Sequence, residues 1–356
     1  MSARFSAKRC LLLFVVGLAP LSVVAQEQPK TTVSGFVDVY YCYDISRPLS
    51  RDRSFTTQPM RHNEFTLNLG MIDVKYQAVN IRGRFAFQTG TYVQSNLAAE
   101  PSLLKNVLEA SVGSQIGTNI WADLGIFPSH IGFEGIVSKD NWNYSRSLLA
   151  DYSPYYESGI SVTVSLSDQL TLRGLLLNGW QNIAETNDSK AFGTQIQYKP
   201  SGSLLANWST FAGNEQPDTS SSRLRFFNDF FAVVTLSDSW SLAVVFDFGM
   251  QKKAAGGSYD SWNTSSIMVK HSIDERWAIG GRVEHFIDKH GSIVPTGTPN
   301  NFQTTGASIN IDYAPVSNLV WRVEARIFSS KDAVYPARTG LKSADGFLTV
   351  SAAVSL

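Results

Sequence analysis

The chain has 356 residues, of which 43% are hydrophobic, 12% aromatic and 17% charged, whereas ordinary soluble domains are about one quarter charged. Its 30 basic residues stand against 30 acidic ones, so the charge balance provides no positive field for nucleic acid and we expect no such partner. After residue 25, no apolar run reaches the roughly 18 residues that a membrane-spanning helix needs, which argues against a helical membrane protein.

The N-terminus has the pattern of a secretory signal peptide. Arg4, Lys8 and Arg9 lie ahead of the apolar run CLLLFVVGLAPLSVV, and small residues ending at Ala25 precede the polar stretch QEQPK. A membrane anchor would need a longer run, and Pro20 interrupts this one. We therefore predict cleavage after Ala25.

Removal of this segment, residues 1–25, takes away three of the 30 basic residues and leaves 27 against 30 acidic ones. The mature chain, residues 26–356, retains one cysteine, Cys42, and so cannot form an internal disulfide. No stretch of it has the composition of a linker between domains, so we expect one domain.

Short segments of the mature chain alternate apolar and polar residues, which is the signature of β-strands. In EFTLNLGM, we expect Phe65, Leu67, Leu69 and Met71 to share one face. In NIRGRFAFQ and LVWRVEARIF, the polar face carries Arg and Glu while the apolar face is rich in aromatic residues. The faces of FFNDFFAVV, residues 226–234, stay unassigned. A strongly polar face opposite an aromatic one is typical of a transmembrane β-barrel.

The alternating segments recur along the whole mature chain, and the links between them alternate in length. Tight turns such as GTN, SDQ and DER contrast with loose links such as GNEQPDTSSSRLR and KHGSIVPTGTPNN. We therefore predict an all-β fold, a transmembrane antiparallel β-barrel of about 16 strands, with tight turns facing the periplasm and long loops facing outside. The predicted strands are 33–44, 64–77, 79–92, 106–116, 119–127, 156–167, 169–179, 189–199, 203–212, 225–237, 239–252, 259–273, 276–288, 302–314, 318–329 and 345–356.

The last predicted strand, GFLTVSAAVSL, alternates up to the final residue, Leu356. A strand that ends the chain can pair with the first strand and so remove the exposed edge of the sheet. Many outer-membrane barrels end in Phe, so Leu356 departs from the usual assembly signal.

One long segment, GIFPSHIGFEGIVSKDNWNYSRSLLADYSPYYESG, interrupts the alternation and is the third and longest of the long loops. Its aromatic residues and its IGFEGI motif would be unfavourable in water and need a wall to pack against. We expect the loop from Pro128 to Pro154 to fold into the barrel and narrow it. The residues predicted for this constriction are His130, Glu134, Trp142, Tyr144 and Arg146. An alternative for His130 and Glu134 is that they hold the shape of the loop through hydrogen bonds.

The motifs GIFPSHIGFE, NWNYSRSLL, YSPYYESG and LLNGW together resemble the OmpL-like β-barrel porin family, β-barrel porin-2. The resemblance covers roughly Thr31 to Leu356 and is sharpest between Gly125 and Trp180. It implies a porin in the outer membrane of a Gram-negative bacterium, forming a water-filled channel for passive diffusion of small polar solutes or ions. It supplies no catalytic residue.

Charged residues on the polar strand faces are expected to point into the lumen, either to set a field across the pore or simply to solvate its wall. The five histidines are scattered without metal-ligand spacing, and we expect no metal and no cofactor. The predicted pore-lining residues are Arg82, Arg84, Asp123, Arg173, Asp247, Arg282, Glu284, Asp312, Arg322, Glu324 and Arg326.

Two other functions remain open. A surface-binding or adhesion barrel would keep the loops but fill the lumen with bulky side chains. An outer-membrane lipid hydrolase would need Ser, His and an acid together, and the adjacent Ser129 and His130 are poorly placed for this, so we expect no enzyme. The expected partners are outer-membrane lipid, small polar solutes or ions, and the barrel assembly machinery, and a homo-oligomer is left open.

Overall fold

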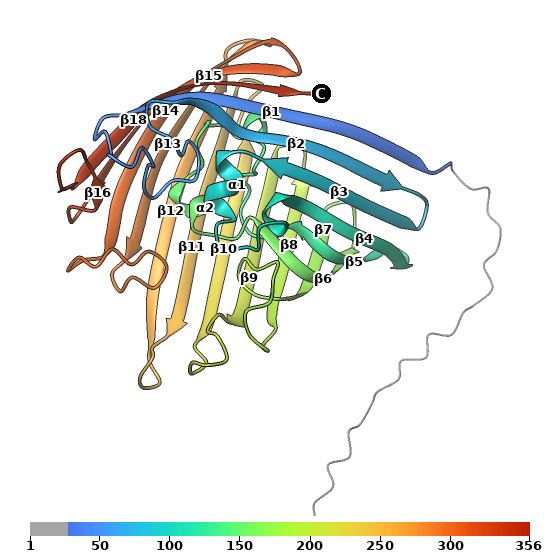
Figure 1. Ribbon diagram of the computed structural model, residues 1–356. Helices are drawn as coiled ribbons and strands as arrows, with labels where there is room; N and C mark the ends of the chain where they lie inside the picture. Colours follow the sequence, from blue (N-terminus) through green and yellow to red (C-terminus); the bar gives the residue numbers. More distant parts are fainter. Residues whose placement is uncertain (1–27) are drawn as a thin grey trace, which may run out of the picture.

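In the computed structural model, which describes residues 28–356, sixteen antiparallel strands close into a barrel (Figure 1). Each of the sixteen predicted strands overlaps one strand of this barrel, so the predicted fold class is confirmed. The predicted signal peptide, residues 1–25, lies outside the described residues. The barrel strands are β1 (Lys30–Asp44), β2 (Phe65–Gln77), β3 (Ile81–Thr89), β4 (Val107–Gly117), β5 (Ile120–Pro128), β6 (Tyr156–Ser165), β7 (Leu170–Leu177), β8 (Ala191–Ser201), β9 (Leu204–Asn214), β10 (Leu224–Thr235), β11 (Trp240–Lys252), β12 (Tyr259–Ser272), β13 (Trp277–Asp288), β14 (Phe302–Val316), β15 (Leu319–Ser330) and β18 (Ala344–Ser355).

The barrel closes through its first and last strands. β1 pairs with β2 on one side and with β18 on the other, and Val37 lies opposite Val354. At the very end of the chain, the backbone N–H of Leu356 donates to the carbonyl of Gly35 at 2.8 Å. Closure pairs the backbone of every strand with two neighbours, which is the condition for crossing hydrocarbon without unpaired backbone groups.

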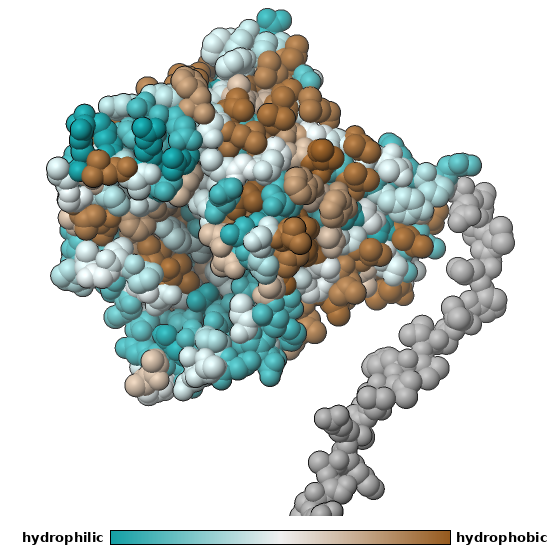
Figure 2. Space-filling view, viewed as in Figure 1, coloured by the Kyte–Doolittle hydropathy of each residue, from teal (hydrophilic) through white to brown (hydrophobic). Residues whose placement is uncertain are grey.

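The two faces of the wall differ as the alternation predicts. Phe85 on β3 and Ile327 on β15 are exposed on the outer face, whereas the neighbouring Arg326 is buried on the inner face. Figure 2 shows hydrophobic side chains gathered over the part of the surface where β1, β2 and β3 lie in Figure 1. An apolar outer face and a polar inner face are what a barrel surrounded by lipid requires.

The predicted faces of β2 need a correction. Phe65 is 86% exposed, but Leu69 is fully buried and Met71 points inward, so the two ends of the strand present different faces. The cause is a β-bulge, a register shift opposite Asp38 and Val39 in β1. An extra residue in one strand of a pair reverses the facing of every residue beyond it.

The faces of β10, which the sequence left unassigned, are now clear. Phe227 and Phe231 are buried on the inner face, while Phe230 is exposed on the outer face. Inside the barrel, Phe227 contacts the ring of Trp180 and Phe231 that of Phe133. The inner face of β10 is aromatic because it packs against loops. With aromatic residues on both faces, the sequence of this strand does not alternate between apolar and polar residues.

The links differ at the two ends of the barrel. One end has tight turns, such as the one in which Asn119 adopts a positive φ of 59°, a conformation that Asn tolerates better than most residues. The other end has the long loops, which contain small elements that the sequence did not predict. These are the helices α1 (Thr91–Asn96) and α2 (Leu148–Asp151), the 3₁₀ turns η1 (Leu104–Asn106) and η2 (Ser138–Asp140), and the hairpin strands β16 (Tyr335–Pro336) and β17 (Leu341–Lys342). Among residues 28–356, no helix is long and apolar enough to cross a membrane.

Candidate functional site

The longest loop, residues 129–155, connects β5 to β6 and contains η2 and α2. Near its base, Gly125 of β5 pairs with Gly159 of β6. Gly125 has a φ of +132°, and a Cβ atom there would collide with the carbonyl oxygen of Ala110 on β4. Glycine is therefore required where the chain leaves the wall to enter the loop.

The loop backbone donates hydrogen bonds to carboxylates on the inner face of the barrel. The N–H of Ser145 lies 2.6 Å from Glu324 on β15, and its hydroxyl lies 2.7 Å from the same carboxylate. The N–H of Leu148, at the start of α2, donates to Glu284 on β13 at 2.6 Å. Hydrogen bonds to an ionised acceptor are stronger than neutral ones, so two carboxylates hold the middle of the loop.

Arginines of the same wall bind the carbonyl groups of the loop. Arg322 donates from Nη2 to the carbonyl of Asn141 at 2.8 Å, and Arg326 donates from Nη1 to that of Arg146 at 2.8 Å. An irregular loop has few internal partners for its buried backbone groups. The barrel provides both acceptors and donors for them. We call the inner faces of β13 and β15, which make these bonds, together with that of β14 between them, which binds the N–H of Tyr144 through Asn310, the covered wall.

The charges of the covered wall compensate one another. Arg326 lies 2.5 Å from Glu284, and Arg282 lies 3.4 Å from Glu324 and 3.6 Å from Glu134 of the loop. Burial raises the pKa of Glu134, although Arg282 opposes this shift. Buried charges require such partners. The loop and wall therefore form one connected ionic network.

His130 is the second residue of the loop and is buried. Its Nε2 lies 2.8 Å from the carbonyl oxygen of Thr210 on β9, and its Nδ1 lies 2.8 Å from Glu157 on β6. Ser129 donates from its hydroxyl to Glu157 at 3.1 Å. Burial alone would lower the pKa of His130, but Glu157 and the two hydrogen bonds outweigh it and raise this pKa. The imidazolium form, with a proton on both nitrogens, satisfies both acceptors.

Arg146 joins three loops. Its guanidinium lies between the rings of Tyr92 in α1 and Tyr155, 4.4 and 4.2 Å from their centres. It donates to the hydroxyl of Thr57 in the first long loop at 2.7 Å and lies 3.9 Å from Asp151. Desolvated cation–π contacts are worth more than exposed ones, so Arg146 is a packing centre of the loop and not a free charge.

Tyr144 and Trp142 complete the residues predicted for the loop. Tyr144 is buried, its N–H donates to Asn310 on β14 at 3.2 Å, and its hydroxyl lies 3.4 Å from Asp38 on β1. The partly exposed Trp142 packs edge-on against Phe133, with ring centres 6.1 Å apart. Four of the five residues predicted for a constriction thus contact the wall or another loop, whereas the ring of Trp142 packs against Phe133 of the same loop.

The opposite side of the barrel is different. Arg84 on β3 makes two hydrogen bonds of 2.9 Å with Asp73 on β2 and one of 2.5 Å with Glu109 on β4. Arg82 is paired in the same bidentate way with Asp123 on β5, with Nε 2.7 Å from Oδ1. Both arginine side chains stay accessible, at 28% for Arg84 and 37% for Arg82. We call the inner faces of β2, β3, β4, β5 and β7 the open wall.

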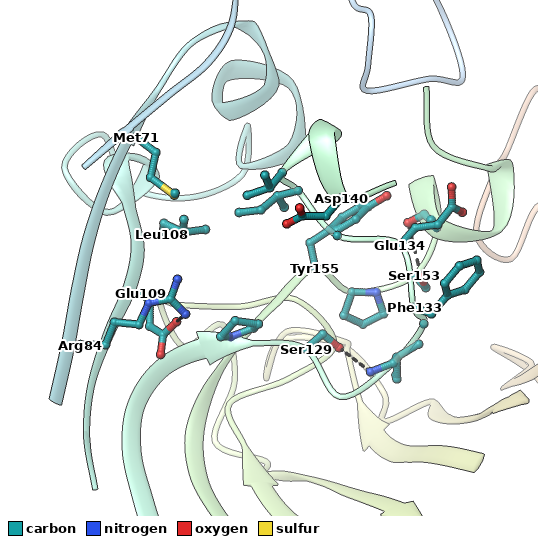
Figure 3. Close-up of a pocket in the computed structure, with 18 residues that line it drawn as sticks. Met71, Arg84, Leu108, Glu109, Ser129, Phe133, Glu134, Asp140, Ser153 and Tyr155 are labelled. Atoms are coloured by element: carbon teal, nitrogen blue, oxygen red, sulfur yellow. Dashed lines mark hydrogen bonds and ion pairs between the residues drawn. The ribbon is translucent and has the colours of Figure 1, made fainter. Parts of the chain in front are cut away.

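Two cavities lie beside the open wall. One has a volume of about 300 Å³ and the other about 500 Å³. Arg84, Glu109, Pro128 and Ser129 border both of them, so the two cavities meet there. Figure 3 shows the smaller cavity, with Met71, Leu108, Arg84 and Glu109 on the side of the wall and Phe133, Glu134 and Asp140 on the side of the loop.

The predicted pore-lining residues divide between these two environments. Arg82, Arg84, Asp123 and Arg173 border the larger cavity. The others point inward but are buried, and Asp247 lies in the wall opposite Asp229 of β10. Those buried beneath protein, and not on an open surface, are Asp247, Arg282, Glu284, Asp312, Arg322, Glu324 and Arg326.

Several residues of the two walls were missed. Asp73 and Glu109 lie inside predicted strands. Alternate residues of a strand face the same side, so the inward facing of Arg84, carried over to the strands that pair with β3, could have placed both acids inside the barrel. Asn310 and Asp38 carry no comparable signal, because their importance comes from a loop contact more than a hundred residues away in sequence. Among residues 28–356, no three His, Cys, Asp or Glu side chains form a group that could hold a metal ion.

Comparisons with known proteins agree with this architecture. The fold is similar to an anion-selective porin from Comamonas acidovorans, with a TM-score of 0.63 and 10% identity over 92% of this chain and 100% of that one. It is also similar to the outer membrane channel DcaP of Acinetobacter baumannii, with a TM-score of 0.63 and 12% identity over 92% of this chain and 97% of that one. OmpT of Vibrio cholerae has a TM-score of 0.61 and 8% identity over 94% of this chain and 100% of that one.

At these identities the solved structures establish the fold alone, and no curated protein sequence matches the chain. The family model described as "Putative beta-barrel porin-2, OmpL-like" matches residues 30–356. That range contains the whole barrel and both walls. The chain therefore belongs to this family and is an outer-membrane porin.

Proposed function

We propose that the protein forms a water-filled channel for passive diffusion of small polar solutes or ions, and that loop 129–155 narrows this channel. The observation that carries the proposal is the pair of meeting cavities between the loop and the open wall. They leave room for water and solute along β2–β5 and β7, whereas hydrogen bonds with the loop occupy β13–β15.

The attachment of the loop supports the proposed narrowing. Its backbone is bonded to inward-pointing side chains such as Glu324 and Arg322 in the middle of β15. A barrel of 16 strands is wide enough to enclose an aqueous channel. A loop held against one side of it restricts passage to the other side, where the charges of the open wall meet the solute.

The geometry favours a channel over the two other functions. Both ring nitrogens of His130 are engaged, by Glu157 and by the carbonyl of Thr210, so neither is free to accept a proton from Ser129. A hydrolase would need such an acceptor. A barrel that served only for surface binding would need no cavities along a charged inner wall.

The surroundings follow from the same proposal. Exposed apolar side chains on the outer face, such as Phe85 and Ile327, would contact outer-membrane lipid. We place the tight turns in the periplasm and the long loops outside, with insertion by the barrel assembly machinery.

A thiol label at a cysteine introduced at Ser220, in the loop between β9 and β10, should react on intact cells. A cysteine introduced at Asp238, in the tight turn between β10 and β11, should not react.

Single-channel recording in planar bilayers tests the proposal. Residues 26–356, refolded and shown by heat-modifiable gel migration to form a barrel, should give discrete conductance steps. A correctly folded barrel that gives no steps would contradict a channel.

A further inference from the structure

Arg173 on β7 differs from the other arginines of the open wall because no carboxylate neutralises it. Among residues 28–356 its guanidinium makes one hydrogen bond, from Nε to the hydroxyl of Ser161 on β6 at 2.6 Å. No carboxylate oxygen of these residues lies within ion-pair distance of it. Its Cζ lies 5.1 Å from the ring centre of Phe127 on β5. The guanidinium is thus fixed in position on one side and free of an acid on the other.

The acids near Arg173 already have other partners. Asp123 is held by both nitrogens of the Arg82 fork, and Glu109 by Arg84. Glu157, on the strand next to β7, accepts hydrogen bonds from His130. Asp123 is thus engaged in a bidentate pair and the other two carboxylates in bonds to Arg84 and His130, and none of the three makes an ion pair with Arg173.

Arg173 borders the cavity of about 500 Å³ beside the open wall. Of the described residues, only two carboxylates border the same cavity, Glu109 and Asp123. The cationic side chains that border it are Lys30, Lys75, Arg82, Arg84 and Arg173. The accessible lining therefore has an excess of positive charge, whereas the mature chain as a whole is slightly acidic. Charge of one sign in a confined aqueous space raises the local concentration of ions of the other sign.

We propose that Arg173, held by Ser161, is an anion-binding site inside the channel that binds small carboxylates or inorganic oxyanions and gives the pore a preference for anions. This inference rests on the proposed channel function and adds the class of solute. The planar fork of an arginine suits two oxygens of one anion, and its unpaired state leaves those donors available.

The experiment measures reversal potential in a potassium chloride gradient across a bilayer, together with block of the chloride current by succinate and by phosphate. The wild-type channel should prefer chloride over potassium. In Arg173→Gln, we expect this preference to fall by roughly two-fold or more, because one of few fixed charges in the path is removed. Block by both anions should weaken as well.

Two further variants separate charge from geometry. Arg173→Lys keeps the charge, so it should retain the reversal potential but lose part of the block, because an ammonium cannot make the bidentate contact. The matched control, Lys270→Gln, removes one cation from the inner face of β12 away from this cavity and should change neither quantity.

The outcomes also separate this inference from the channel proposal. A conducting wild-type channel that prefers potassium overturns the anion site alone, and so does an Arg173→Gln channel with unchanged reversal potential and block. Stronger block by succinate than by phosphate would assign the site to carboxylates, and the reverse order to inorganic oxyanions. Absence of any conductance overturns the channel and this inference together.

Discussion

The covered wall and the open wall are built from the same residue types but use them differently. On the covered wall, the arginine and glutamate side chains of β13 and β15 are buried and bind the backbone of loop 129–155. On the open wall, Arg82 and Arg84 of β3 pair with acids of β2, β4 and β5 and stay accessible. An inward-pointing charge in a barrel is therefore not automatically a pore charge. Its role depends on whether a loop binds it.

The largest effect is expected from removing the part of the loop that the covered wall holds. Deleting Lys139 to Arg146 removes the carbonyl groups of Asn141 and Arg146, to which Arg322 and Arg326 donate, while all sixteen barrel strands keep their pairing. The channel should then widen, with conductance rising by roughly two-fold or more and larger polymers gaining entry. Single-channel conductance and polymer exclusion measure this.

Deleting residues 216–222 from the loop between β9 and β10 is the control, and it should leave conductance near its wild-type value. Equal conductance in the wild type and the first deletion would show that loop 129–155 does not narrow the pore, and the two walls would then be equally open.

A matched substitution on each wall should separate their contributions to stability. Glu324→Gln leaves the buried Arg282 without one of its carboxylate partners and weakens two hydrogen bonds from Ser145. The expected loss is about 3 kcal/mol, as for a broken buried pair. Glu109→Gln leaves Arg84 accessible and still paired with Asp73, so the loss should be at most about 1 kcal/mol.

Denaturant titration followed by gel migration measures both variants. If Glu109→Gln lowers the free energy of unfolding as much as Glu324→Gln does, the proposed difference between the two walls is wrong.

The same two variants should rank in the opposite order for ion selectivity. Glu109 borders both cavities, so Glu109→Gln removes a negative charge from the proposed path and should increase preference for anions. Glu324 is fully buried, and its neutralisation should change the reversal potential less, provided that the loop stays in place. A larger shift for Glu324→Gln would mean that the solute passes along β15.

The sequence predicted the barrel well because closure and lipid contact impose a period of two on every strand. It failed where a local event breaks that period. The bulge in β2 reverses the facing of Leu69 and Met71, and the aromatic inner face of β10 imitates a lipid-facing one.

The candidate site was predicted less completely. The sequence singled out the loop and five residues in it, because a long aromatic segment stands out between regular strands. Which charged residues it would bury was not predictable, since bonds such as the one between Ser145 and Glu324 join residues far apart in sequence. The unpaired state of Arg173 likewise depends on which acids its neighbours hold.

The smallest expected effect concerns pH and the first anchor of the loop. His130 is bonded to Glu157 and to the carbonyl of Thr210, and these partners raise its pKa above the ordinary value of 6.5 in spite of burial. A histidine with a raised pKa in the folded state contributes stability that is fully present below the unfolded pKa and is lost as pH rises through the folded pKa. The wild type should therefore lose stability from about pH 6.5 upward, relative to His130→Gln, which cannot titrate. Arg173 and Asp229 also act on or near His130, but both are present in either protein, so the difference between the two unfolding curves isolates the imidazole. If that difference stays flat with pH, or if the wild type gains stability as pH rises, His130 is not held as an imidazolium and the loop is anchored at this end by neutral hydrogen bonds alone.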